Sequence, residues 1–366
     1  MGIYIDDIIY AYILVCIGLI LFNVIYMFFT SYKNGQDNNY IIRWDKYIKK
    51  QIELIKDGKS IEPEHKNNLE KRLMFTNQLV AYVRALDKLR EQGFNTRPYL
   101  FENYESFQYL AGKYKNEEVV ARAFFAYFIS KNAPCDGIKH NSLIESLLSY
   151  LNNSNMYCRE NVLKALYSIG NLQSVENAFH ILDKNKYFHH YKLLSDGLLT
   201  FTGDKEALAE KLYRHIRTWD VNMAIAVIKF ISLTSDKYNE RFLLLLKKRD
   251  VDPEIRIAII RYFGHNVYEP AYQLLLKYMK ITNFTNENIV IVTASVLDKY
   301  PGNETITVLK EALKNPNWYI RYNSAISLVK LKVGINELQD ILNGEDQYAK
   351  EIITYIQGLE RNVDKI

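Results

Sequence analysis

The sequence predicts an all-helical chain with one N-terminal transmembrane helix, a helical hairpin beside the membrane, and an array of stacked helical pairs (an α-solenoid). Three observations support this fold class. Residues 8–32 form an apolar run without a charged side chain. From Arg122 onward, a pattern of apolar and small residues recurs every 31 to 37 residues. The 366 residues include only 15 Gly and 7 Pro, fewer than the many turns of an all-β protein require.

Composition indicates a folded protein of a reducing compartment. Apolar residues make up 48% and charged residues 24% of the chain, enough to build a core. The net charge of +5 is spread without a Lys/Arg block, which argues against a nucleic-acid-binding protein. Cys16, Cys135 and Cys158 show no CxxC spacing, so no disulfide framework is expected.

Residues 1–32 are predicted to form a short tail and a membrane-spanning helix. The apolar run 8–32 exceeds the roughly 20 residues that cross a bilayer. A buried core helix is the alternative to a membrane span. A cleaved signal peptide fits the sequence worse, because it would need basic residues before the apolar run, where Asp6 and Asp7 stand. The basic flank follows the span and consists of Lys33, Arg43, Lys46, Lys49 and Lys50. This asymmetry predicts a single-pass protein of the cell membrane with its N-terminus outside and its C-terminal body in the cytoplasm.

Residues 33–100 are predicted to form a helical hairpin next to the membrane or against the following repeats. The first helix carries one apolar stripe at Ile41, Trp44, Ile48, Ile52 and Ile55 and ends near Gly58. One long second helix follows Glu62-Pro63 and stops at Gly93; its stripe is Leu69, Leu73, Leu79, Val80, Val83, Leu86 and Leu89. Four lysines, Lys46, Lys49, Lys50 and Lys56, are candidates for contact with anionic lipid headgroups, with a solvated helix face as the alternative.

Residues 101–366 are predicted to form the array. The recurring helix opens at Arg122, Arg159, Tyr191, Asn222, Arg256, Val290 and Arg321. The intervening helices are expected at 142–151, 174–182, 204–216, 238–247, 270–279, 304–313 and 335–342. A period in the thirties with one helical pair per unit is typical of an α-solenoid, because a single pair cannot bury its own apolar face.

The units resemble the HEAT-repeat family, in which a helix is followed by a linker such as Asp-Pro and then by Val-Arg and small residues. The best matches are residues 309–325, with Asn315-Pro316 and Ile320-Arg321, and residues 250–256, with Asp252-Pro253 and Ile255-Arg256. The units that open at Tyr191, Asn222 and Val290 lack the arginine, which leaves the register and the number of repeats open. The resemblance implies a structural role for Arg122, Arg159, Arg256 and Arg321, which would bond the linkers of adjacent units.

No catalytic or nucleotide-binding motif is present, so neither an enzyme nor a cofactor is expected. The adjacent pair His189-His190 is the most noticeable group of histidines. Successive residues of a helix point about 100° apart, which makes the pair a poor chelator, and no metal site is predicted.

The candidate partner-binding surface follows from the resemblance, because the second helices line the concave face in HEAT proteins. The residues expected there are Met223, Val227, Ile257, Ala258, Ile291, Tyr322 and Ile326. We expect this groove to receive an apolar helix or loop of a partner protein. The alternative is that curvature or the hairpin buries these side chains within the chain.

The expected function is that of a membrane-anchored scaffold or adaptor for a membrane-embedded protein partner. The chain is similar to bacterial single-span HEAT-repeat proteins, some of which are encoded beside membrane glycosyltransferases for exported polysaccharide. Two other classes stay open. A nucleic-acid-binding HEAT-like protein would show a basic concave face, and a lyase-like or chaperone HEAT protein would resemble the soluble phycobilin lyases.

Overall fold

The computed structural model describes residues 19, 22, 38–132, 141–280 and 286–363, and every regular element within these ranges is a helix. The chain divides into two compact units, residues 1–178 and 179–366, and the division falls inside one helix. The predicted span 8–32 lies outside the described residues except for Leu19 and Phe22. Among the helices that are described, none combines the length and apolarity that crossing a membrane requires.

The first unit begins with a helix over residues 38–56, which buries Trp44, Ile48 and Ile52 as its stripe predicts. Gly58 follows with a φ of +73°, a conformation that glycine adopts without strain. The further helices of this unit are α2 (Pro63–Leu73), α3 (Thr76–Glu91), α4 (Arg97–Glu102), α5 (Tyr104–Tyr114), α6 (Val119–Asn132), α7 (Asn141–Tyr150), α8 (Met156–Ile169) and the start of α9 (Leu172–Lys184).

The expectation of one long helix from Pro63 to Gly93 is wrong. The structure ends α2 at Leu73 and begins α3 at Thr76, with Phe75 in an extended conformation between them. The reason lies in the spacing of the stripe: Leu73 and Leu79 are six residues apart, so a continuous helix would turn the apolar face away from the core. The break lets α2 pack on α3 and α5, while α3 packs on α6.

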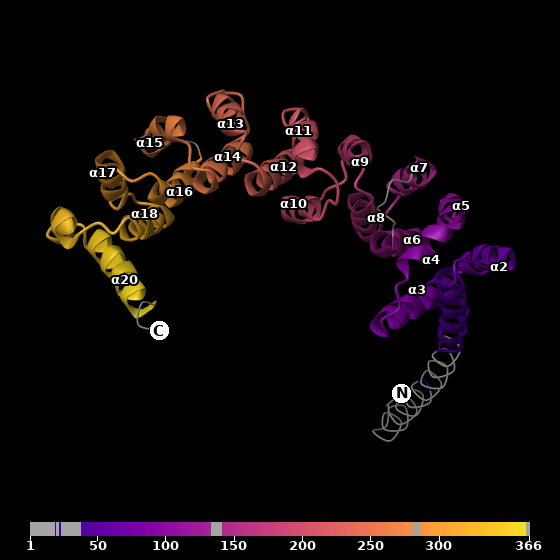
Figure 1. The fold of residues 1–366 in the computed structure, drawn as a ribbon. Helices are drawn as coiled ribbons and strands as arrows, with labels where there is room; N and C mark the ends of the chain where they lie inside the picture. The colour runs from indigo at the N-terminus through magenta and orange to yellow at the C-terminus, as the bar shows by residue number, and fades with distance from the viewer. Residues whose placement is uncertain (1–18, 20–21, 23–37, 133–140, 281–285, 364–366) are drawn as a thin grey trace, which may run out of the picture. The chain divides into compact units, whose positions relative to one another are not determined.

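The second unit repeats one arrangement of paired helices (Figure 1). One row is α10 (Tyr191–Leu199), α12 (Val221–Thr234), α14 (Pro253–His265), α16 (Glu287–Val296), α18 (Trp318–Lys330) and α20 (Gln347–Val363). The other is α11 (Lys205–Tyr213), α13 (Asn239–Leu246), α15 (Tyr272–Lys280), α17 (Asn303–Ala312) and α19 (Gln339–Leu342), with short 3-10 turns η1 (Glu269–Ala271), η2 (Leu297–Lys299) and η3 (Ile335–Leu338).

Each helix of the first row packs on the next helix of that row, from α10 to α20. Most members of the second row also pack on the first-row helix that follows them in sequence. All seven predicted opening positions, from Arg122 to Arg321, fall on alternate helices from α6 to α18. The predicted intervening helices match α7, α9, α11, α13, η1 with α15, α17, and η3 with α19. The stacked pairs predicted by the period are therefore present within each unit.

Asn and Asp in the linkers begin the helices that follow. Their side-chain oxygens accept hydrogen bonds from backbone N–H groups of the first turn, which would otherwise lack a partner inside the helix. The capping residues are Asn155 of α8, Asp204 of α11, Asp220 of α12, Asp252 of α14, Asn286 of α16 and Asn317 of α18. Each cap contributes about 1 kcal/mol, so the polar linkers define where most repeat helices start.

Buried hydroxyl groups join helices of successive pairs inside each unit. In each case the hydroxyl donates to a carbonyl in the last turn of another helix, where the backbone has no partner of its own. The bonds of this hydroxyl ladder are Tyr114 to Leu73 (2.7 Å), Tyr150 to Ala111 (2.5 Å), Tyr278 to Leu246 (3.2 Å), Tyr300 to Phe263 (2.9 Å) and Ser327 to Ala294 (2.6 Å). The ladder thus satisfies helix ends that apolar packing alone would leave unpaired.

Candidate functional site

The four repeat arginines are bonded to linkers. Arg122 donates to the carbonyls of Asn152 (3.3 Å) and Asn153 (3.0 Å), in the linker of the following pair. Arg159 donates to the Ser154 carbonyl at 2.6 Å, in the linker just before its own helix. These contacts tie the guanidinium groups to the backbone.

Arg256 and Arg321 bond the linkers before their own helices in the same way. Each also bonds a residue that follows its own helix, which is Tyr278 for Arg256 and Asp346 for Arg321. Arg256 donates to the carbonyls of Leu246 (2.7 Å) and Lys248 (2.9 Å). Arg321 donates to the Asn315 carbonyl and pairs with Asp346 at 2.8 Å. A structural role accounts for both side chains, so we do not assign them to a ligand.

The structure separates the seven predicted partner-binding residues into two groups. Four are buried within the chain: Met223, Val227, Ile257 and Ala258. Their side chains belong to the packing between helices and offer almost no surface. The other three, Ile291, Tyr322 and Ile326, are half-buried. Ile291 packs against a small core cluster of Val290, Ala312 and Ile320, so its outer edge alone is accessible.

An exposed group of aromatic side chains surrounds Tyr322. Trp318 lies one helical turn before Tyr322 on α18 and stacks on it, with ring centroids 4.8 Å apart and ring planes 16° apart. Tyr319 meets the edge of the Trp318 indole at 5.2 Å. The exposed fractions are 56% for Trp318 and 61% for Tyr319, although both are large apolar side chains. Neither Trp318 nor Tyr319 is among the partner-binding residues that the sequence predicts.

Helix α20 packs on α18 and adds two more exposed aromatic rings. Tyr348 is 73% and Tyr355 is 60% exposed, and their spacing of seven places them on one face of α20. The Arg321 guanidinium lies 5.7 Å from the centre of the Tyr348 ring. We call Trp318, Tyr319, Tyr322, Tyr348 and Tyr355 the aromatic surface. Rings of this size, held on two packed helices and open to solvent, are suited to contact with another macromolecule.

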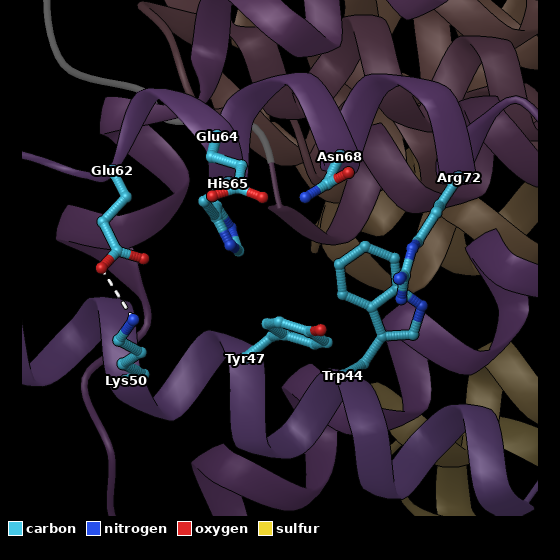
Figure 2. Close-up of a pocket in the computed structure, with 8 residues that line it drawn as sticks. All are labelled: Trp44, Tyr47, Lys50, Glu62, Glu64, His65, Asn68 and Arg72. Atoms are coloured by element: carbon cyan, nitrogen blue, oxygen red, sulfur yellow. Dashed lines mark hydrogen bonds and ion pairs between the residues drawn. The ribbon is translucent and has the colours of Figure 1, made fainter.

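A second candidate site is a hollow of about 150 Å³ between helix 38–56 and α2 (Figure 2). Trp44 and Tyr47 form its floor, and their rings meet edge to face at 6.5 Å. The Arg72 guanidinium lies 5.4 Å from the centre of the Tyr47 ring. At the other end, Lys50 pairs with Glu62 at 2.7 Å, as Figure 2 shows. This ion pair joins the two helices and closes that end of the hollow.

His65 lies at the inner wall of the hollow and is only 6% exposed. Its Nε2 lies 2.9 Å from the Tyr99 hydroxyl, which in turn accepts a hydrogen bond from the Tyr82 hydroxyl at 3.3 Å. Burial lowers the pKa of His65 from 6.5 to about 4, because the charged imidazolium would lose its hydration. His65 is therefore neutral at physiological pH and acts as a member of a buried hydrogen-bond network.

A larger hollow of about 710 Å³ adjoins the first and shares Tyr47, Lys50 and Arg72 with it. Its remaining lining is Arg43, Lys46, Lys49 and Glu53, so cationic groups predominate. Three of the four candidate lipid-binding lysines have another contact. Lys50 pairs with Glu62, and the ammonium groups of Lys49 and Lys56 lie 5.0 and 5.3 Å from the centre of the Phe94 ring. The hollow offers several cations to an anionic group such as a phosphate or a carboxylate.

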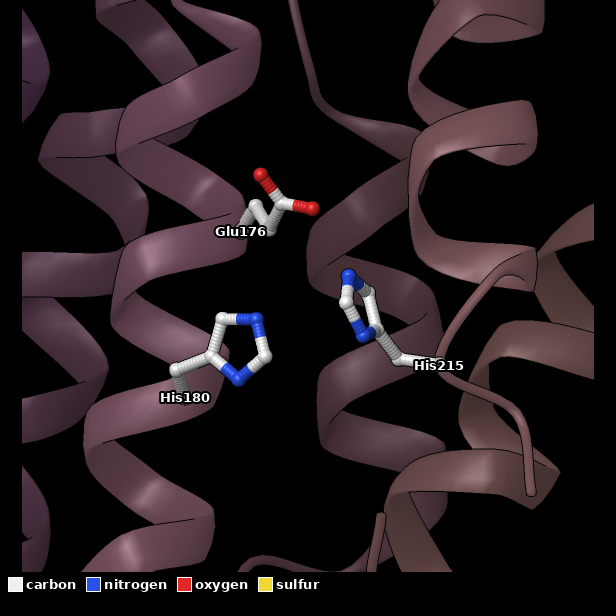
Figure 3. Close-up of side chains that lie close together, drawn as sticks. All are labelled: Glu176, His180 and His215. Carbon is white, nitrogen blue, oxygen red and sulfur yellow. The ribbon is translucent and has the colours of Figure 1, made fainter. Parts of the chain in front are cut away.

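The histidines that the structure brings together are not the pair noted in the sequence. His189 is buried, whereas His190 is exposed and caps α10 by accepting from the Lys192 N–H at 3.2 Å. His180 and His215, which are far apart in sequence, have ring centroids 4.5 Å apart (Figure 3). The periodic pattern predicts one in the helix 174–182 and the other in the helix 204–216, but gives no indication that they meet.

No known protein family matches this chain, and neither does any curated protein. The functional assignment therefore depends on the residues and surfaces described above.

Proposed function

We propose that this chain is a membrane-tethered scaffold of the HEAT-repeat type, which holds a protein partner on the aromatic surface of α18 and α20. The observation that carries the proposal is the exposed stack of Trp318 on Tyr322, with centroids 4.8 Å apart. Tyr322 was already a candidate partner-binding residue on sequence grounds, and the structure adds the rings around it.

The chemistry of the aromatic surface favours a protein partner. Trp and Tyr carry most of the binding energy at protein interfaces, because each buries a large rigid area at a small cost in conformational entropy. Trp318 and Tyr322 already stack, which reduces the side-chain freedom that binding would remove. Arg321 is held by Asp346 at 2.8 Å beside Tyr348, so the surface contains an ordered charged pair within an apolar area.

The tether rests on the N-terminal sequence and on the basic helix that follows it. The apolar run 8–32 is long enough to span a bilayer, and the first cations of helix 38–56 come shortly after it. Arg43 and Lys46 line the larger hollow, where a lipid phosphate would find several cations. On this proposal the repeat units lie in the cytoplasm, and the N-terminus lies outside the cell membrane.

The class of partner follows from the resemblance to bacterial single-span HEAT-repeat proteins. A scaffold fixed to the membrane meets membrane proteins most readily, because both are confined to the same surface. We therefore propose an integral membrane enzyme as the partner, with a glycosyltransferase for an exported polysaccharide as the first candidate. An apolar helix or loop at its cytoplasmic face would fit the aromatic surface.

Site-specific photo-crosslinking in native membranes tests the proposal. A benzophenone amino acid is introduced in place of Trp318 or Tyr355 in the full chain, and adducts are identified by mass spectrometry. The matched control is the same probe in place of Leu244, which is 56% exposed on α13. We expect one integral membrane protein to be crosslinked from Trp318 and Tyr355 but not from Leu244.

Two outcomes would overturn the proposal. Equal crosslinking from all three positions would show that the aromatic surface has no specific partner. Crosslinking of nucleic acid that is lost as the salt concentration rises would show that a different class of molecule binds there.

A C-terminal fusion to green fluorescent protein tests the orientation, because this reporter stays dark after export of the unfolded chain across the bacterial membrane.

A further inference from the structure

The larger hollow of the first unit lies along helix 38–56 and is bounded on the other side by Arg72 of α2. It meets the smaller hollow of Figure 2 at three shared residues, Tyr47, Lys50 and Arg72. A ligand in the larger hollow can therefore extend past Tyr47 into the smaller one. We call the larger hollow, of about 710 Å³, the basic hollow.

The positive charge of the basic hollow is not balanced by the chain around it. The lining contains five cationic side chains and one carboxylate, that of Glu53. Among the residues that the structure describes, no carboxylate forms an ion pair with Arg43, Lys46 or Arg72. Like charges that are held close together repel one another, so a bound anion would lower the electrostatic energy of the basic hollow.

Arg72 is the cation best placed to hold an anion. It is half-buried, and its guanidinium lies 5.4 Å from the centre of the Tyr47 ring, a cation–π contact that restrains the side chain. Within the described part of the chain, this guanidinium makes no hydrogen bond or ion pair. Its planar fork of N–H groups can therefore donate two parallel hydrogen bonds to two oxygens of one anion.

The walls of the basic hollow are fixed by contacts that do not involve a ligand. The buried Gln51 amide donates to the Glu62 carboxylate at 2.9 Å, and the Gln51 side-chain oxygen accepts from the Glu62 N–H at 3.1 Å. The Trp44 indole N–H donates to Gln78 at 3.1 Å, which joins helix 38–56 to the start of α3. Helix 38–56 and α2 therefore keep their separation without an anion between them.

The arrangement of the unpaired cations matches a phosphate better than a carboxylate. Arg43 and Lys46 reach the basic hollow from helix 38–56, whereas Arg72 reaches it from α2. A tetrahedral phosphate can accept from both sides at once, because its oxygens point in several directions. A planar carboxylate has only two oxygens and is saturated by a single guanidinium fork.

We infer that Arg72, together with Arg43 and Lys46, binds the phosphate group of an organic phosphate, and that the Tyr47 ring lies against the group that carries this phosphate. The phosphate has two sources, a phospholipid headgroup and a soluble phosphate ester. The lipid source rests on the proposed membrane tether, because helix 38–56 follows the apolar run 8–32 closely. The phosphate site itself does not depend on the tether or on the aromatic surface.

The experiment is a calorimetric titration of the full chain, purified in an uncharged detergent and washed free of lipid. One arm uses glycerol 3-phosphate and adenosine 5′-monophosphate in solution. The other arm adds phosphatidylglycerol to the micelles, with phosphatidylcholine, which has no net charge, as its control. We expect binding in at least one arm, a higher melting temperature of the bound chain, and a loss of affinity as the salt concentration rises.

Variants show whether the basic hollow is the binding site. Arg72→Gln should weaken binding at least about tenfold, and so should the double variant Arg43→Gln with Lys46→Gln. Arg72→Lys keeps the charge but loses the paired donors, so it should weaken binding as well. The matched control is Lys71→Gln, which makes the same change of charge one residue away, at an exposed position outside both hollows. It should change the affinity by no more than about twofold.

The two arms identify the source of the phosphate. Binding of the soluble esters assigns the basic hollow to a soluble phosphate, and binding of phosphatidylglycerol alone assigns it to a lipid. Absence of binding in both arms, or equal losses in Arg72→Gln and Lys71→Gln, would overturn the inference. Because the first of these results comes from the wild-type chain, the test stands even if a variant fails to fold.

Extraction of native membranes with alkaline carbonate tests the tether separately. Release of the chain from the membranes would remove the tether but leave the result with the soluble esters unchanged. A chain that stays in the membranes but binds phosphate in neither arm would retain the tether and lose the phosphate site.

Discussion

The guanidinium of Arg256 donates from Nη1 to the hydroxyl of Tyr278 at 2.7 Å, and the same hydroxyl donates to the Leu246 carbonyl. Arg256 also bonds Leu246 directly, so α13, α14 and α15 share one network. Arg256→Ala should lower the free energy of unfolding by about 1 to 3 kcal/mol, because it leaves carbonyl groups of the linker without donors. Thermal melting followed by circular dichroism measures the change.

Arg261→Ala is the control for this prediction. Arg261 is exposed on the same helix as Arg256, so its loss should change stability by no more than about 0.5 kcal/mol. Equal melting temperatures for the two variants would contradict a structural role for Arg256.

Gly264 of α14 lies against Val296, the last residue of α16. A methyl group in its place would stand 2.7 Å from Cγ2 of Val296, which is buried. Gly264→Ala should therefore destabilise the chain by about 1 to 3 kcal/mol through overpacking. Gly112→Ala is the matched helical control, because nothing lies within 4 Å of its added methyl group. The control should stabilise the chain by about 0.5 to 1 kcal/mol, and a gain of similar size at Gly264 would refute close packing there.

The neutral His65 predicts a dependence of stability on pH. Its pKa is about 4 in the folded chain and 6.5 in the unfolded one, so between these values the unfolded state binds more protons. Stability should be complete above pH 6.5 and should fall as the pH is lowered toward 4, by up to about 3 kcal/mol. Urea unfolding at a series of pH values measures this slope.

His65→Gln keeps a hydrogen-bonding group near Tyr99 but does not titrate. The variant should show a flatter slope between pH 4 and 6.5 than the wild type. Identical slopes would mean that another group is responsible for the pH dependence.

Cys158 should be inert toward thiol reagents in the folded chain. It is fully buried, and burial raises the pKa of its thiol, so both access and thiolate formation are suppressed. In a chain with Cys16→Ser and Cys135→Ser, we expect Ellman's reagent to react only after a denaturant is added. Rapid labelling of the native protein would show that the first unit opens readily around α8.

The pattern of the sequence was sufficient to predict the paired helices, because their signals are local. The apolar spacing and the Asn and Asp caps lie within a few residues of each helix that they define. The break at Phe75 was not predicted, although the apolar spacing indicates it. The interval between Leu73 and Leu79 does not fit the apolar stripe of one continuous helix. Helix α20 was not predicted, because it lies beyond 335–342, the last helix that the repeat pattern predicts.

The candidate sites depend on contacts between pairs, which a periodic pattern does not specify. Four of the seven residues that were expected to line the groove are buried. The repeat period therefore predicts which face of a helix a residue lies on, but not whether that face is accessible to a partner. Trp318 lies within the best repeat match, but the repeat period does not indicate that its side chain is exposed. His180 and His215 are far apart in sequence, and nothing in the local sequence of either indicates that their rings meet.

The chain contains 29 tyrosines, and four of their phenols belong to the hydroxyl ladder. Each rung joins residues 32 to 41 positions apart, close to the length of one helical pair. In evolutionary terms, duplication or loss of a whole pair copies or removes a rung together with its acceptor. An insertion of a few residues inside a pair would instead shift a donor away from its carbonyl. The ladder therefore favours change of chain length by whole repeats and restricts smaller insertions to the linkers.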